Sequence, residues 1–282
     1  MLMKPLMAHP DMRRAAQAGG DGGEAAPPKP LYVIDQNILA AMVGLAACSL
    51  PAIMYLGRRV FDRCDYDSIS HFYYTPFFGD FFVGVLVFIG VFMTIYRVDS
   101  EFESRLANFA GLCAFTVALC PTEGSGCDRA AFSGRAFVTL ATEGRNLAAI
   151  TDPAALPGHF QLIPHADWVH GSAAALLFLF LTYYCLVVFP RVDPVTHCRG
   201  GVRHGGMTGV KKARNGVYYL SGAVMLASLV MLLVGVAGPK LGFDWPGWDR
   251  NNLTFWAESA ALIAFGASWL VRGRFGNLAM RD

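Results

Sequence analysis

Polar side chains with catalytic or ligand-binding chemistry lie at the ends of apolar stretches in three distant parts of the chain. They are three hydroxyl-bearing residues, two imidazoles and two carboxyls: Ser68, Ser70, Tyr74, His71, His170, Asp80 and Glu258. Imidazoles and carboxylates are ligands that zinc accepts, and a bound zinc ion activates water. Without a metal, the same groups can form a polar or proton-coupled binding site inside a membrane. If the apolar stretches span a membrane, all these side chains reach the same surface and form one candidate site.

Glu258 is the sharpest single signal in the sequence. It lies about one helical turn inside the apolar segment NLTFWAESAALIAFGASWLV, where an ionised carboxylate costs on the order of 2.5 kcal/mol or more. Small residues on one face of this segment predict that Glu258 faces other helices. We expect His170 to be its partner, with Ser70, His71 or Tyr74 as alternatives.

His170 and Asp80 each have a functional and a structural interpretation. His170 is followed by the small residues GSAAA, so its imidazole is expected to point into a helix bundle. A satisfied structural hydrogen bond is the competing interpretation. Asp80 follows SISHFYYTPFFG, and a place at the start of a helix explains it as well as function does. Trp256 marks the membrane interface beside Glu258. The candidate ligand-binding residues are Ser68, Ser70, Tyr74 and Trp256.

Six apolar runs supply the elements that must position these side chains. They cover residues 37–57, 79–96, 106–120, 168–189, 217–238 and 254–271. A helix needs about 20 residues to cross the hydrocarbon core, and the third run is short. The sequence predicts an all-α polytopic membrane protein, a bundle of six transmembrane helices. The alternative, five spans with a re-entrant hairpin, would move the C-terminus to the other side.

The composition excludes most soluble classes. The chain is 54% apolar and 16% charged, whereas a soluble domain carries about 25% charged residues. No Walker motif or dinucleotide fingerprint is present, and no nucleic-acid partner is predicted. Lys and Arg are in excess on one side, which places both termini in the cytoplasm. We expect the protein to lie in the inner membrane of a bacterium. The expected organisation is a disordered tail over residues 1–30, a transmembrane domain over 31–274 and a second tail over 275–282.

Cysteines and basic residues give two further hypotheses. Cys64 and Cys127 fall on the outer face, where an oxidising periplasm allows a disulfide between them, with free thiols as the equal alternative. On the inner face Lys211, Lys212 and Arg214 form a cluster that suits anionic lipid headgroups. The orientation signal alone also explains this cluster.

Three functional classes fit the candidate site. The first, which we favour, is an outward-facing pocket that binds a lipid or a small molecule. The second is a metal-dependent hydrolase or transferase acting on a lipid, in which His71, His170 and either Asp80 or Glu258 bind zinc and activate water. The candidate catalytic residues are these same four side chains. The third is a structural or accessory protein, in which the same groups form a buried network.

Several segments carry a resemblance to known proteins. SISHFYYT, GDFFVG, LANFAGLCAFTVALCPT, HGSAAALLFLFL, KKARNGVYYLSG and ESAALIAFGASWLVRG resemble bacterial six-helix membrane proteins of the DUF998 and FRAG1/DRAM type, families of unknown function. A more distant similarity links Ser68, His71, Asp80 and His170 to the alkaline ceramidase superfamily. That superfamily has seven spans and two histidines four residues apart, and this chain has neither.

Overall fold

The computed structural model describes residues 35–62, 66–98, 100–120, 166–192, 207–243 and 245–274, and these residues contain no strand. They form six long helices: α2 (Gln36–Gly57), α3 (Pro76–Ile95), α4 (Glu101–Leu119), α5 (Ala166–Tyr183), α6 (Gly209–Ala237) and α7 (Leu253–Arg272). Shorter turns are Arg58–Asp62, Ser70–Tyr74, Tyr184–Val188 and Pro239–Leu241. The predicted all-α class is confirmed for the described residues. The two predicted tails lie outside them.

Three helices, α3, α4 and α6, begin three or more residues before their apolar runs, because their first turns depend on other signals. Pro76 occupies the first turn of α3, where its missing N–H leaves no bond unmade. Ser100 caps α4, with its Oγ accepting from the Glu103 N–H at 3.5 Å. Thr208 caps α6, with its Oγ accepting from the Lys211 N–H at 3.2 Å. α6 therefore starts well before residue 217.

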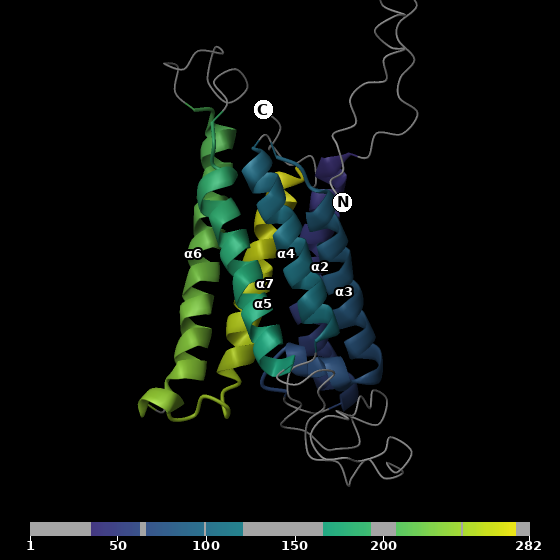
Figure 1. The fold of residues 1–282 in the computed structure, drawn as a ribbon, viewed down its shortest axis with the longest axis vertical. Helices are drawn as coiled ribbons and strands as arrows, with labels where there is room; N and C mark the ends of the chain where they lie inside the picture. The colour runs from purple at the N-terminus through teal and green to yellow at the C-terminus, as the bar shows by residue number, and fades with distance from the viewer. Residues whose placement is uncertain are drawn as a thin grey trace, which may run out of the picture. The chain divides into compact units, whose positions relative to one another are not determined.

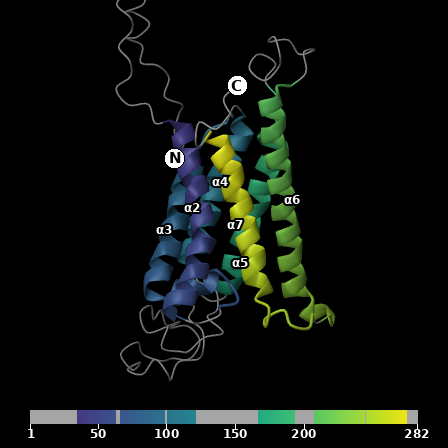
Figure 2. The ribbon, with the colours of Figure 1, turned by 180° about the vertical axis from the view of Figure 1, so that it is seen from behind.

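The six helices form a closed ring. They run alternately in opposite directions, and each packs against the next in chain order, while α2 and α7 pack together and close the ring. α4 lies lengthwise between α3 and α5 (Figure 1). The start of α2 and the end of α7 lie at one end of the bundle, as the reverse view also shows (Figure 2). The segment between α2 and α3 and the starts of α3, α5 and α7 gather at the other, which we call the site end.

Glycines let two helix pairs approach closely. A Cβ on Gly266 of α7 would lie 2.6 Å from the backbone oxygen of Gly44 on α2. A Cβ on Gly111 of α4 would lie 2.8 Å from the backbone oxygen of Gly90 on α3. Such contacts are typical of packing in membranes, where association depends on close van der Waals fit. The α2–α7 and α3–α4 pairs are therefore held close together in the ring.

The outer surface of the bundle is apolar on every helix. Leu45 on α2, Leu179 on α5 and Leu220 on α6 are 54%, 49% and 66% exposed, and other large apolar side chains are exposed on α3, α4 and α7. Soluble monomers rarely expose contiguous apolar patches of this extent. Among the described helices, five are long and apolar enough to cross a membrane, and α4 is the exception because charged side chains occupy its first turns. The helices suit an integral membrane protein.

Candidate functional site

The segment between α2 and α3 packs on the start of α7. The Asp67 carbonyl accepts from the Phe255 N–H at 2.7 Å, which pairs one of the N–H groups that a helix start leaves free. Ser68 Oγ lies 2.9 and 3.0 Å from the two carboxyl oxygens of Glu258, and the Ile69 N–H donates to one of them at 2.6 Å. The prediction that His170 is the direct partner of Glu258 was wrong, because the Ser68 hydroxyl and the Ile69 N–H bond to this carboxyl instead.

His170 is instead bonded to Ser70. Its Nε2 lies 2.9 Å from the Ser70 Oγ, and its Nδ1 lies 2.7 Å from the backbone oxygen of Cys120, at the end of α4. Both side chains are buried, so the expectation that the imidazole points into the bundle is confirmed. A carbonyl oxygen can only accept, so Nδ1 carries the proton that bonds to it. In the neutral ring, Nε2 is therefore the acceptor for the Ser70 hydroxyl.

A second imidazole is paired with a carboxyl that sequence reasoning missed. His71 Nδ1 lies 2.5 Å from Asp67 Oδ1. Burial raises the pKa of Asp67, but the hydrogen bond and the positive charge of His71 together lower that pKa below its ordinary value. The four-residue spacing of Asp67 and His71 could have suggested the pair.

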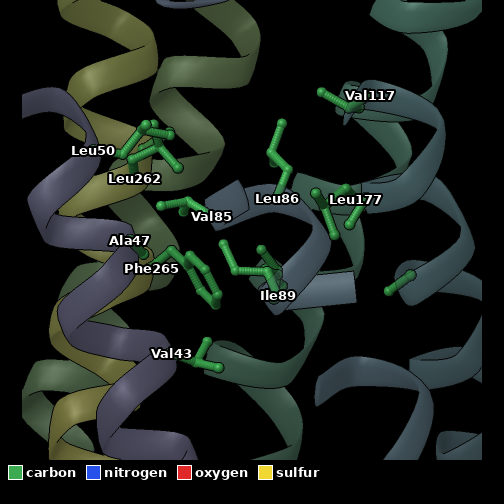
Figure 3. Close-up of a cluster of buried hydrophobic side chains, with 14 of the residues drawn as sticks. Val43, Ala47, Leu50, Val85, Leu86, Ile89, Val117, Leu177, Leu262 and Phe265 are labelled. Atoms are coloured by element: carbon green, nitrogen blue, oxygen red, sulfur yellow. The ribbon is translucent and has the colours of Figure 1, made fainter. Parts of the chain in front are cut away.

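These groups form the polar end of a cavity of about 740 Å³ inside the ring. The polar side chains that line it are Asp67, Ser68, Ser70, His71, His170, Ser172, Lys240, Thr254 and Glu258. The remaining wall is largely apolar, and Figure 3 shows part of it, with side chains that converge from different helices. Labelled residues that line the cavity are Leu50, Leu86, Ile89, Val117, Leu177, Leu262 and Phe265. The cavity is thus amphipathic, with its polar groups at the site end.

Lys240 and Trp168 meet at the border of this cavity. The Lys240 Nζ lies 4.2 Å from the centre of the Trp168 ring, a cation–π contact that joins the turn after α6 to the start of α5. Both residues line the cavity, and Trp168 is 58% exposed. Sequence reasoning assigned neither residue to the site, because their contact depends on the ring that brings α5 next to α6.

Other predicted site residues lie elsewhere. Asp80 is exposed on α3, one turn after the helix start, and Trp256 is 49% exposed on the outer face of α7 beside Tyr55. Neither lines the cavity. The side chain of Tyr74 and the predicted disulfide pair, Cys64 and Cys127, lie outside what the structure describes.

The predicted zinc ligands are not assembled. Within the described residues, no three His, Cys, Asp or Glu side chains are grouped so that they could hold a metal ion. His170 and His71 are instead bonded to Ser70 and Asp67, and Asp80 is exposed on α3 and does not line the cavity that both histidines line.

At the opposite end of the bundle, the basic residues differ in burial. Lys211 and Arg214 are 1% and 2% exposed, because they lie on the face of α6 that packs into the bundle. The Lys211 Nζ donates to the Phe189 carbonyl at 3.1 Å. Only Lys212 of the three predicted headgroup ligands is exposed, so they do not form one surface cluster.

The same end holds an ion pair whose carboxylate is buried. Glu103 of α4 is 3% exposed and accepts two hydrogen bonds from the half-exposed guanidinium of Arg191, one of them at 2.9 Å. The Tyr183 hydroxyl donates to the Glu103 carboxylate at 3.2 Å, and the Tyr184 hydroxyl donates to its backbone oxygen at 2.9 Å. Glu103 thereby joins α4 to the end of α5.

No family model, curated protein or solved structure matches this chain. The candidate site therefore stands on its geometry, a cavity inside a helix ring with hydroxyl, imidazole and carboxyl groups at one end.

Proposed function

We propose that this chain is a six-span integral membrane protein whose cavity binds a lipid or a small amphiphilic molecule. The observation that carries the proposal is the amphipathic cavity itself. Apolar ligand pockets in proteins typically measure about 300–1,000 Å³ with a few polar groups that orient the ligand, and this cavity of about 740 Å³ falls in that range.

The depth of the polar groups supports a lipid-like ligand. His170 and Glu258 are the fifth and sixth residues of α5 and α7, so both lie roughly 6 to 8 Å along the helix axis from its start. A helix of 20 residues is about 30 Å long, the thickness of the hydrocarbon core, so these groups lie in the outer part of that core when the helix spans it. A ligand with its polar part at this level would place its apolar part among the leucine and phenylalanine side chains of the wall.

α4 is included as the sixth span because of its place in the ring. It runs the length of the bundle between α3 and α5, and Phe109 and Leu112 on its outer face are 45% and 59% exposed. Its charged residues lie in the first turns, where they can reach the headgroup region. With six spans, the start of α2 and the end of α7 lie on the same side of the membrane. The excess of Lys and Arg on that side assigns it to the cytoplasm.

Topology is tested with reporters fused after Asp282. The proposal predicts activity of a reporter that works only in the cytoplasm, and no activity of one that works only in the periplasm. The reverse result would overturn the proposed topology of six spans with both termini in the cytoplasm.

Ligand binding is tested by filling the cavity. Ala174→Trp on α5 places an indole where Ala174 lines the cavity, and the expected result is loss of most lipid that remains with the purified protein in native mass spectra. Leu179→Trp, on the exposed face of the same helix, is the matched control and retains the lipid. Equal lipid content in both variants and in wild type would contradict the proposal.

A further inference from the structure

We propose that Ser70 and His170 are a nucleophile and its base, and that they cleave an ester bond of an amphiphile held in the cavity. This inference rests on the proposed function, because the same cavity must admit the substrate. It assigns a reaction and a substrate class, carboxylic esters with an apolar acyl chain, to the cavity's polar end.

The hydrogen bonds of His170 set the direction of proton transfer. The Cys120 carbonyl holds the proton on Nδ1, so the lone pair of Nε2 faces the Ser70 Oγ at 2.9 Å. Serine nucleophiles are activated by an adjacent base that a third group orients, and here a backbone carbonyl is the orienting group. The tautomer is the one that general-base catalysis requires.

The chain around Ser70 is held in place by Glu258. The carboxyl binds the Ser68 hydroxyl and the Ile69 N–H, and the Ser68 Oγ in turn accepts from the Ser70 N–H at 3.1 Å. Three consecutive residues are thereby fixed to α7. Glu258 acts through the position of Ser70, and it is a positioning residue in this reaction.

Access distinguishes this pair from a hydrogen bond that only joins two elements. Ser70 and His170 are both buried from the outer surface, yet both line the cavity. Their level is about one helical turn inside the starts of α5 and α7, just below the ester groups of membrane lipids, which lie between polar headgroups and hydrocarbon. The apolar wall beyond them accommodates the acyl chain.

The reaction balances with water as the second substrate. Ser70 Oγ forms a bond to the ester carbonyl carbon while its proton moves to His170 Nε2. The bond from that carbon to the alcohol oxygen then breaks, and His170 returns the proton to the departing alcohol. Water adds to the acyl-serine with its proton passing to His170, and the Ser70–acyl bond breaks, so that the acid is released and Ser70 regains its proton.

Lys240 is a positively charged donor on the same wall, available to the carbonyl oxygen of the tetrahedral intermediate. The His71 imidazole, whose Nδ1 lies 2.5 Å from Asp67 Oδ1, also lines the cavity. A cationic donor placed where charge develops lowers the barrier of acyl transfer. The backbone N–H groups of Ile69 and Ser70 are already bonded to Glu258 and Ser68.

The test is covalent labelling of the full-length protein in detergent with an alkyl fluorophosphonate, which reacts with activated serines. The expected result is an adduct on Ser70, located by peptide mass spectrometry. Ser70→Ala should abolish labelling, and His170→Gln should slow it at least about 100-fold, the lower range for loss of a general base. Ser259→Ala, at a buried serine that does not line the cavity, should label at the wild-type rate.

Two outcomes separate this inference from the proposed function. If wild type forms no adduct on Ser70 while Ala174→Trp still removes bound lipid, the ester cleavage is refuted and lipid binding stands. If lipid content does not depend on the cavity, the proposed function fails, and with it the substrate class. Because the first result is measured on wild type, it does not depend on whether any variant folds. Labelling that persists in His170→Gln at the wild-type rate would also overturn the inference.

Discussion

The two ends of the helix ring both bury polar side chains, but they satisfy them in different ways. At the end opposite the site end, Glu103 is bonded to Arg191 and two tyrosines, and Lys211 is bonded to the Phe189 carbonyl. None of these residues lines the cavity. At the site end, Ser70, His170 and Glu258 are also hydrogen-bonded, yet they keep one side toward open space.

The difference teaches how to distinguish structural from functional burial. A buried charge whose partners surround it contributes to stability, because any lost partner leaves it uncompensated. A polar group at a cavity wall retains room for water or a ligand, so its substitution should alter chemistry more than stability. The following substitutions test that contrast.

The largest effect on stability is expected for Glu103→Ala. The substitution removes the carboxylate that joins α4 to Arg191 and Tyr183. The loss is limited because Arg191 is half exposed and can be rehydrated. We expect the free energy of unfolding to fall by about 2 to 3 kcal/mol. Glu101→Ala is the matched control, since its pair with Arg105 is at the surface and contributes less than about 1 kcal/mol. Unfolding in denaturant, monitored by circular dichroism, measures both. Equal losses would remove the basis for calling the Glu103 contact structural.

A smaller loss is expected for Lys211→Met. The variant keeps the apolar stem of the side chain but removes the hydrogen bond to the Phe189 carbonyl, which costs about 1 to 2 kcal/mol when the acceptor stays buried. Lys212→Met, one residue further on the exposed face of α6, should stay within about 0.5 kcal/mol of wild type. The same unfolding experiment applies. A larger loss for Lys212→Met would mean that the exposed face carries the interaction.

Glu258→Gln is expected to change stability by less than about 1 kcal/mol. The amide oxygen of the glutamine can still accept from the Ile69 N–H. The adjacent cavity can admit water that bonds to the amide nitrogen. A loss larger than that of Glu103→Ala would erase the contrast between the two ends. It would favour a purely structural network at the site end.

The smallest effect concerns pH. The pKa of Asp67 in the folded protein lies below its ordinary value of 3.8, so the contribution of this group is complete above that pH and is lost as the pH falls through the folded pKa. Asp67→Asn should therefore flatten the decrease of the melting temperature below about pH 4. His71→Ala, which removes the group that lowers the pKa, should flatten it too. A decrease as steep as in wild type in both variants would show that the pair does not contribute.

Much of the fold could be predicted because hydrophobic run length reports directly on helices in a membrane. All six runs correspond to helices, and the errors fall at starts such as those of α4 and α6, where Ser100 and Thr208 set the first turn. The early start of α6 also explains why Lys211 was expected at the surface. Its burial depends on a helical period that begins before the apolar run.

The sequence predicted residues of the site but not which of them bond to each other. Glu258 and His170 stood out because each is polar within an apolar run, and both line the cavity. Their partners depend on the path of residues 66–75, which no periodicity specifies. The Cys120 carbonyl, which orients His170, is a backbone group present at every position and therefore invisible to residue-type reasoning.

The contact between α2 and α7 has a consequence for biosynthesis. The ribosome synthesises α2 first and α7 last among the six described helices. The surface of α2 around Gly44 therefore cannot contact Gly266 until nearly all of this helical region has been made. Glu258 arrives on the same helix and only then fixes Ser68 and Ile69. A nascent chain that stops before α7 would thus carry Ser70 and His170 without the helix that holds the Ser70 turn in place.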